Sequence, residues 1–279
     1  MWHQDSEPSL VPGMGHFFHL SQGFEVRRGD GSPLCRLVDD ITIVDDLDPA
    51  ASPDGSWHRL LTDDRRVLQL LAEQCDPGGD LATSLDAVGK LWGTAPTHHG
   101  PAVRLDDRTG ATVALATLQG GERERPCEVV TPPLAHDHEA ALEELLGPAR
   151  ELGFTVPVEA AVHLHLDGAP FRAADRLAHV IRLFGHRRDE LRDLLGTNPR
   201  CRRLAPLPEK LVRVADGTPS YDEIRAAAGG LTKFFDVNLT QLLRDDPVRD
   251  TLEIRILPGA ITGAEIVQRA ALLEPLLFA

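Results

Sequence analysis

The chain has 279 residues, of which 42% are hydrophobic and 26% charged, a composition typical of a globular protein with a sizeable core. Its formal net charge is −14. This charge argues against a nucleic-acid or anionic-membrane partner, because binding to phosphates requires a basic protein surface.

Export and membrane insertion are not expected from the sequence. No run of about 18 uninterrupted apolar residues is present to span a bilayer, and the opening MWHQDSEPSL lacks the basic and apolar regions of a secretory signal. The four cysteines, Cys35, Cys75, Cys127 and Cys201, lie far apart and form no CxxC pattern. A disulfide framework or zinc knuckle is therefore not expected, and we predict a cytoplasmic protein with reduced thiols.

Loops and short helices are predicted in the first half of the chain. Residues 45–56, 76–80 and 93–101 are rich in Pro, Gly and Asp, which favour turns. Between these loops, apolar residues at helical spacing predict helices over residues 63–75 and 83–92.

Longer helices are predicted in the second half. Apolar spacing predicts one helix over residues 137–152 and another over residues 172–195, and a glycine follows each. Two more helices are predicted at capping boxes, in which Ser or Thr is followed three residues later by Glu. These boxes are Ser220 with Glu223 and Thr262 with Glu265.

Four segments alternate with a period of two and predict β-strands: GFEV (residues 23–26), CEVVT (127–131), VHLHLD (162–167) and LEIRIL (252–257). In each strand the apolar residues face one way, and helices are expected to cover that face. The opposite face carries Glu25, Glu128, His163, His165, Asp167, Glu253 and Arg255.

The residue types on this polar face point to metal and phosphate chemistry. A face that is polar only for solubility usually mixes Thr, Lys, Gln and Ser, and that explanation stays open for any single strand. Here carboxylates and imidazoles predominate, which suit magnesium or manganese, and Arg255 suits a phosphate oxygen. If this polar face lines a cleft and Glu253 points into it, Glu253→Ala is expected to abolish turnover and to spare the fold.

The strand motifs, taken in chain order, resemble the amidoligases, relatives of glutamine synthetase and glutamate–cysteine ligase. The matching pieces are GFEV, EVVTPPL (128–134), VHLHLD, KFFDVNLT (233–240) and LEIRILPGA (252–260). The resemblance covers residues 126–276 and the first strand near residues 23–44. It implies an α+β fold with a curved, mainly antiparallel sheet and helices on one face, as in the catalytic domain of glutamine synthetase.

The resemblance also guides the interpretation of domains. It assigns no counterpart to residues 45–125, which we interpret as an insertion or lid. Residues 1–19 are interpreted as an N-terminal arm, and residues 20–279 as a single catalytic domain that contains the insertion.

Site residues follow from the same resemblance. The catalytic candidates are Arg255, which would hold a phosphate, with Glu253 and Lys233; Asn238 lies where the family carries polar groups near substrate or nucleotide. The implied magnesium ligands are Glu25, Glu128, His163, His165 and Glu253, and which of the two histidines binds the metal is left open.

Three arginines are weighed separately. The family's first strand commonly carries a second acid where this chain has Arg27, which leaves the number of metal ions open. Arg27 is expected to form a salt bridge with a neighbouring acid or to contact substrate. Arg202 and Arg203 are candidates for recognising a substrate carboxylate with their fork-shaped guanidinium groups, and ordinary surface charge is the alternative.

The implied function is an ATP-dependent carboxylate–amine ligase that acts through an acyl phosphate, with ATP and magnesium or manganese as cofactors. Its substrates would be a small-molecule or peptide carboxylate and an amine or ammonia; their identity and the oligomeric state are not predicted. The motifs GxxxxGK[ST], GxSxG and HExxH do not occur. Two alternatives stay open: a catalytically inactive amidoligase-like binding protein, and a metal-dependent hydrolase that uses the HLHLD histidines.

Overall fold

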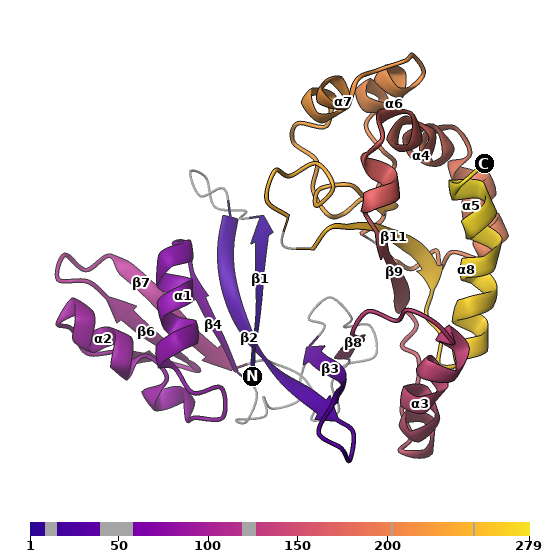
Figure 1. Ribbon diagram of the computed structural model, residues 1–279. Coiled ribbons are helices and arrows are strands. Elements are labelled where there is room, and N and C mark those ends of the chain that lie inside the picture. The colour runs from indigo at the N-terminus through magenta and orange to yellow at the C-terminus, as the bar shows by residue number, and fades with distance from the viewer. Residues whose placement is uncertain (9–15, 40–57, 119–126, 202, 248) are drawn as a thin grey trace. The chain divides into compact units, whose positions relative to one another are not determined.

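The computed structural model describes residues 1–8, 16–39, 58–118, 127–201, 203–247 and 249–279. The chain divides into two compact units, unit 1 (residues 1–133) and unit 2 (residues 134–279), each with its own hydrophobic core (Figure 1). Both units combine helices with mainly antiparallel sheet, so the predicted α+β class is confirmed. None of the helices in these ranges is long and apolar enough to cross a bilayer.

Unit 1 is built on an antiparallel sheet that has eight strands within the described ranges. The strands are β1 (Trp2–Pro8), β2 (His16–Arg27), β3 (Pro33–Asp39), β4 (His58–Thr62), β5 (Thr97–His99), β6 (Ala102–Asp106), β7 (Thr112–Leu118) and β8 (Cys127–Val130). Their order is β5-β6-β7-β4-β2-β3-β8, and β1 pairs with β2. The long β2 strand joins the two ends of this sheet, because it pairs with β4 through residues 18–21 and with β3 through residues 23–27.

The helices of unit 1 cover only part of its sheet. Helix α1 (Arg65–Gln74) and helix α2 (Asp86–Trp92), with the 3-10 turn Leu81–Thr83, share a core with β2, β4, β6 and β7. The apolar face predicted for the other end of the sheet is not covered in the same way: Phe24 is 52% exposed and Val129 is 38% exposed. That expectation was wrong for these two residues, because α1 and α2 pack on the strands at the opposite end.

Most local predictions for unit 1 are confirmed. The segment 23–26 lies in β2, the segment 127–131 contains β8, and the two predicted helices correspond to α1 and α2. Residues 97–99, predicted within a loop, instead form the short strand β5, which pairs with β6. The predicted loop at residues 45–56 lies outside the described residues. The division into an arm, a domain and an insertion stays a prediction.

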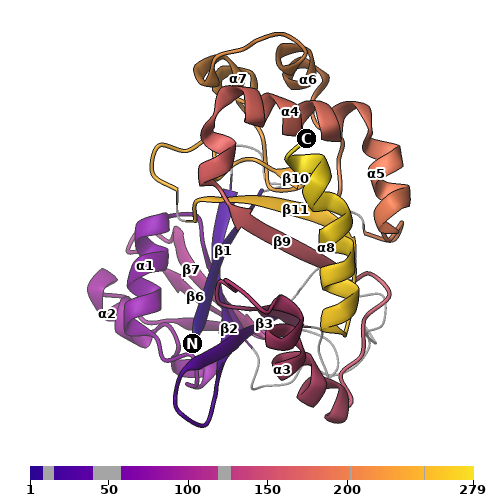
Figure 2. The same ribbon diagram turned by 45° about the vertical axis from the view of Figure 1, so that its right-hand side comes forward.

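Unit 2 contains a three-stranded antiparallel sheet of β9 (Ala161–Asp167), β10 (Val237–Asn238) and β11 (Thr251–Pro258), with β11 in the centre. Its helices are α3 (His138–Glu151), α4 (Ala174–His186), α5 (Arg188–Leu195), α6 (Glu209–Ala215), α7 (Tyr221–Ala227) and α8 (Gly263–Leu277), with a 3-10 turn at Ala169–Arg172. Helices α4, α5 and α8 lie along one side of this sheet (Figure 2). Leu252, Ile254 and Ile256 enter the core on that side, as their alternation predicts.

The helix predicted over residues 172–195 is broken in two. Helix α4 ends at His186, Arg187 has the non-helical angles φ −111° and ψ 26°, and α5 begins at Arg188. Asp189 and Glu190 occupy the first turn of α5, where acidic residues stabilise a helix start. The prediction of one continuous helix was therefore wrong.

The other predicted helix starts in unit 2 are confirmed. The capping box of Ser220 and Glu223 is present at α7 with both of its hydrogen bonds. At α8, the Thr262 hydroxyl accepts a hydrogen bond from the N–H of Glu265. The same hydroxyl donates to Glu265 Oε2 at 2.8 Å. Helix α3, His138–Glu151, corresponds to the helix predicted at residues 137–152.

A β-bulge interrupts the pairing of β11 with β9. Ile254 pairs with Leu164 and Leu257 pairs with Val162, so two residues of β11, Arg255 and Ile256, lie opposite one residue of β9. A bulge bends the strand and changes the direction of the side chains that follow it. Ile256 and Leu257 are accordingly both buried although they are consecutive.

Candidate functional site

Five polar side chains meet on the sheet of unit 2. Glu253 in β11 pairs with Asn238 in β10 on one side and with His165 in β9 on the other. Cross-strand partners share a face of the sheet, so these three side chains point to the same side. Arg255 and His163 follow two residues away along their strands and complete the cluster, which we call the polar cluster.

Glu253 is at the centre of the polar cluster and is only 8% exposed. Its Oε2 accepts a hydrogen bond from Asn238 Nδ2 at 2.6 Å, and its Oε1 accepts one from Arg255 Nη1. His163 Nδ1 lies 3.4 Å and His165 Nε2 3.9 Å from Oε1. Burial opposes ionisation, but Arg255, the Asn238 hydrogen bond and the two imidazoles together hold the pKa of Glu253 below its usual value.

The orientation of the Asn238 amide supports an ionised Glu253. Asn238 Oδ1 accepts the Thr240 N–H at 3.0 Å and the Thr240 hydroxyl at 2.7 Å. Because the amide oxygen is held there, its NH₂ group faces Glu253 as a donor. A donor in this position requires an acceptor, so the contact favours the carboxylate over the carboxylic acid.

The two histidines make different contacts. His165 Nδ1 lies 3.1 Å from the Thr251 hydroxyl, and burial lowers the pKa of His165 although Glu253 opposes this. His163 instead turns Nδ1 toward the cluster, 3.5 Å from Arg255 Nη1. The two histidines therefore differ in their contacts, and which of them binds a metal stays a prediction.

Two further predicted residues come together near β10. Arg203 and Lys233 are 30 residues apart in the chain, but a parallel bridge between Ala205 and Phe235 brings their segments side by side. Arg203 Cζ lies 4.7 Å and Lys233 Nζ 5.6 Å from the centre of the Phe234 ring. Such cation–π contacts orient both cations, and their substrate roles stay predictions. Arg202 lies outside the described residues.

Glu25 and Glu128 lie in unit 1, on one face of its sheet. Glu25 pairs with Arg36 of β3 and Glu128 pairs with Val38 of the same strand, so β3 runs between the two acids. Arg27 Nη2 lies 2.7 Å from Glu25 Oε1, which is one of the two contacts expected for Arg27. The structure thus places two predicted metal ligands in unit 1, on the strands either side of β3, and the other three in the polar cluster of unit 2.

A comparison with protein families gives the class of protein. The family model described as "Putative amidoligase enzyme" matches residues 44–276. The chain belongs to this amidoligase family. The match contains the whole polar cluster of the amidoligase and residues 45–125, and it begins after Glu25 and Arg27. No curated protein and no solved structure matches the chain.

The amidoligase's donors fit a phosphate better than a metal ion held by unit 2 alone. No group of three or more His, Cys, Asp or Glu among the described residues is arranged to hold a metal. The single carboxylate of the polar cluster is already paired with Arg255. In contrast, Arg255 is 9% exposed, and its Nε is buried with no hydrogen-bond partner among the described residues. A buried donor of this kind fits an oxygen ligand.

Sequence reasoning missed a second buried acid beside the polar cluster. Asp236 is 1% exposed and is paired with Arg188 and Arg192 of α5. It lies two residues before Asn238 in the segment KFFDVNLT, and this spacing was the available signal. Its pairing with the two arginines could not be predicted, because one continuous helix was predicted over residues 172–195, whereas α5 is a separate helix that begins at Arg188.

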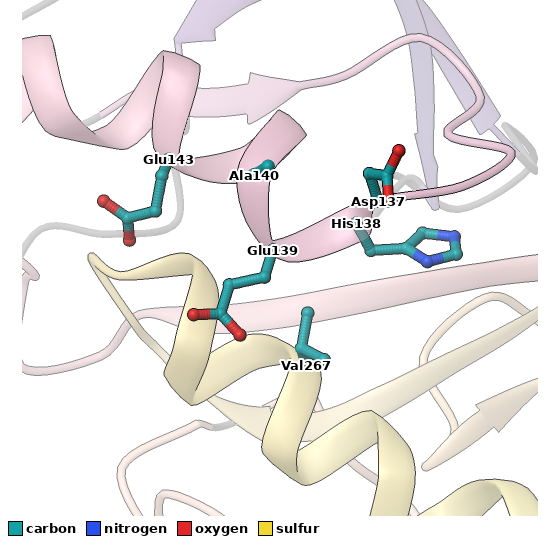
Figure 3. A pocket seen from close by; sticks show the side chains of 6 residues that line it. All are labelled: Asp137, His138, Glu139, Ala140, Glu143 and Val267. Atoms are coloured by element: carbon teal, nitrogen blue, oxygen red, sulfur yellow. The ribbon is translucent and has the colours of Figure 1, made fainter.

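A separate cavity of about 500 Å³ lies in unit 2, where the start of α3 approaches α8 (Figure 3). Three of its six lining residues are acidic, and none belongs to the polar cluster; the lining consists of Asp137, His138, Glu139, Ala140, Glu143 and Val267. Glu143 is also engaged with Arg150 at 2.7 Å. This cavity is therefore distinct from the candidate site.

The predicted effect of Glu253→Ala on the fold changes with this geometry. The sequence interpretation placed Glu253 on an open cleft wall, where removal of the side chain would spare the fold. Glu253 is instead buried and paired with a buried Arg255. Removing one member of such a pair leaves an uncompensated charge, so the variant is expected to lose stability.

Proposed function

We propose that this amidoligase is an ATP-dependent carboxylate–amine ligase that activates its acid substrate as an acyl phosphate. The observation that carries the proposal is Arg255, a buried guanidinium with one side held by an ionised Glu253 and with Nε left without a partner among the described residues. Family membership over residues 44–276 supports a ligase reaction.

Arg255 would act on the transferring phosphoryl group. In phosphoryl transfer, negative charge is spread over the equatorial oxygens, and fixed cationic donors stabilise it without reorganisation. Glu253 holds the Arg255 guanidinium in place from the neighbouring strand position, and Asn238 holds Glu253. The polar cluster therefore supplies a donor that is already oriented when the nucleotide arrives.

The reaction has two bond exchanges. First, a carboxylate oxygen of the acid forms a bond to the γ-phosphorus of ATP, and the bond to the bridging oxygen breaks, which releases ADP. Second, the amine nitrogen forms a bond to the acyl carbon, phosphate leaves, and the nitrogen loses a proton. Arg255 is the residue that we propose to act in the first exchange, in which the phosphoryl group carries the charge.

Magnesium, when bound, would neutralise charge on the triphosphate. The sequence predicts Glu253 and one of His163 and His165 in unit 2, and Glu25 and Glu128 in unit 1, as magnesium ligands. These assignments stay predictions, because no group of three such ligands is arranged to hold a metal among the described residues. The steps above depend on the chain's own residues, of which Arg255 is the one assigned to the phosphoryl oxygens.

Hydroxylamine offers a test without knowledge of the natural amine. It attacks acyl phosphates to give hydroxamates, so a panel of amino acids and dicarboxylates can be incubated with Mg-ATP and hydroxylamine while ADP and hydroxamate are measured together. The proposal expects acid-dependent release of equal amounts of both. ADP release that does not depend on an acid, or amide hydrolysis without ATP, would contradict it.

Arg255→Lys is the decisive variant, because lysine keeps the charge and loses the fork-shaped donor set. We expect turnover to fall at least about 100-fold, the scale seen when one charge-stabilising donor is removed from an active site. Arg172→Lys is the control, since the Arg172 guanidinium bonds Asp250 in the same unit, and neither residue belongs to the polar cluster. If Mg-ATP neither turns over nor raises the melting temperature of the wild type, the protein is a binding scaffold instead.

A further inference from the structure

Asp236 lies directly before β10 and is buried beside the polar cluster. Its Oδ2 accepts from Arg188 Nε at 2.6 Å, and its Oδ1 accepts from Arg192 Nη1 at 3.2 Å. Both arginines project from α5, one helical turn apart. The three charges therefore tie the segment that enters β10 to a helix of the core.

The backbone of Asp236 is also attached on both sides. Its N–H donates to the carbonyl of Ala205 at 3.0 Å, and its carbonyl accepts from the N–H of Arg255 at 3.0 Å. Strand β10 itself has only two residues, which pair with β11 at two ladder positions. Such a short ladder contributes few hydrogen bonds, so much of the attachment of this strand comes from Asp236.

Asn238 lies two residues beyond this anchor and donates to Glu253. We propose that Asp236 is a positioning residue of the ligase site and acts through Asn238 on Glu253, an inference that rests on the proposed function. A buried ion triad is weak evidence for a gain in stability, since apolar residues of similar volume often do as well. A role in positioning Asn238 would explain why Asp236, Arg188 and Arg192 are all charged.

Asp236→Asn tests the inference, because the side chain keeps its shape and loses its charge. We expect kcat to fall about 10- to 100-fold, the scale of a displacement of about 1 Å, with KM for ATP changed by less than about threefold. Asp245→Asn is the control: it removes another Asp–Arg pair of unit 2, the exposed pair with Arg225, and neither of these residues lies in β10. A purely structural role would lower the melting temperature of Asp236→Asn and leave kcat unchanged, which would overturn the inference.

The proposed path through Asn238 is tested by a double-mutant cycle with Asn238→Ala. If Asp236 acts through Asn238, kcat of the double variant is lower than kcat of Asn238→Ala by no more than about twofold. The reason is that Asp236 has no amide to position once Asn238 is replaced. Effects that multiply would show that Asp236 acts elsewhere. That result would overturn the proposed path.

A second measurement separates this inference from the proposed function. The imidazole nitrogen resonances of His163 and His165 report the position of Glu253 in the free protein, without turnover. They are expected to shift in Asp236→Asn and to stay unchanged in Asp245→Asn. Unshifted resonances would overturn the positioning role, whereas a wild type that releases no ADP would overturn only the ligase proposal.

Arg192→Met takes the place of Asp236→Asn if that variant does not fold, because it leaves Asp236 paired with Arg188. The same loss of kcat and the same shift of the imidazole resonances are expected, at the lower end of the range. Wild-type kcat and unshifted resonances in this folded variant would overturn the inference.

Discussion

Removal of Glu253 is expected to destabilise unit 2. In Glu253→Ala the buried Arg255 loses its counter-charge and Asn238 loses its acceptor. Breaking a buried ion pair by removal of one partner costs about 3–5 kcal/mol, and because both side chains keep some exposure we expect about 3 kcal/mol. In Glu253→Met/Arg255→Met the charge is gone, so the double variant should recover about half or more of that loss, and the remaining cost comes from Asn238.

Urea unfolding with two probes provides the assay. The three tryptophans, Trp2, Trp57 and Trp92, all belong to unit 1, and the single tyrosine, Tyr221, belongs to unit 2. Far-UV circular dichroism reports the helices of both units, and tryptophan fluorescence follows unit 1 as an internal comparison. Separate fits for the two probes are needed, because a chain of two units need not unfold in one step.

The pH dependence provides a further check. The pKa of Glu253 is lowered in the folded state, so its stabilising effect is complete above its unfolded value of about 4.5 and is lost as the pH falls through the folded pKa. The difference between the wild type and Glu253→Ala should therefore be largest at neutral pH and shrink in acid. A difference below about 1 kcal/mol at pH 7, or a double variant less stable than Glu253→Ala, would refute the reasoning.

Three other predictions concern the scaffold. Burial lowers the pKa of His58, so the unfolded chain binds the proton first and stability falls as the pH drops below about 6.5; His58→Phe should flatten this slope in tryptophan-detected unfolding, and an unchanged slope would contradict the assignment. Gly185→Ala should destabilise α4, because the added Cβ would lie 2.6 Å from Val212, and a second change, Val212→Ala, should recover the lost stability. Gly147→Ala in α3 meets no close atom and should stabilise by up to about 1 kcal/mol. Thermal unfolding followed by circular dichroism measures both effects. Ser220→Ala removes the capping box of α7 and should cost about 1 kcal/mol, measured by urea unfolding; no loss would mean that the cap is replaced.

Local patterns in the sequence were sufficient to predict strands β9 and β11 of the candidate site, but they did not predict the two-residue strand β10. Alternation with a period of two identified the segments that contain Glu25, Glu128, His163 and Glu253, because the two faces of a strand meet different surroundings. The pattern also predicted that Leu252 and its apolar neighbours enter the core. What it could not predict is which polar residues of different strands become partners, since register depends on contacts between distant segments.

Burial and helix direction were also beyond local patterns. Alternation predicts that Glu253 and Arg255 leave the apolar core, but it does not tell whether the face they occupy is open to solvent. The break at Arg187 lies two residues after Gly185, but a single glycine inside a helical pattern does not by itself predict the end of a helix. The pairing of Asp236 was missed because its partners, Arg188 and Arg192, lie on α5, the helix that follows this break.

The extra residue that β11 carries between Ile254 and Leu257 divides this strand into two independent halves. A shift by one position in a ladder turns every later side chain to the opposite face. Deletion of Ile256 would remove the offset, and Leu257 would then follow Ile254 by two positions and keep its place opposite Val162 on the core face. Glu253 would still lie across from His165. Changes in chain length on the side that leads to α8 can therefore accumulate without altering the polar end of the strand.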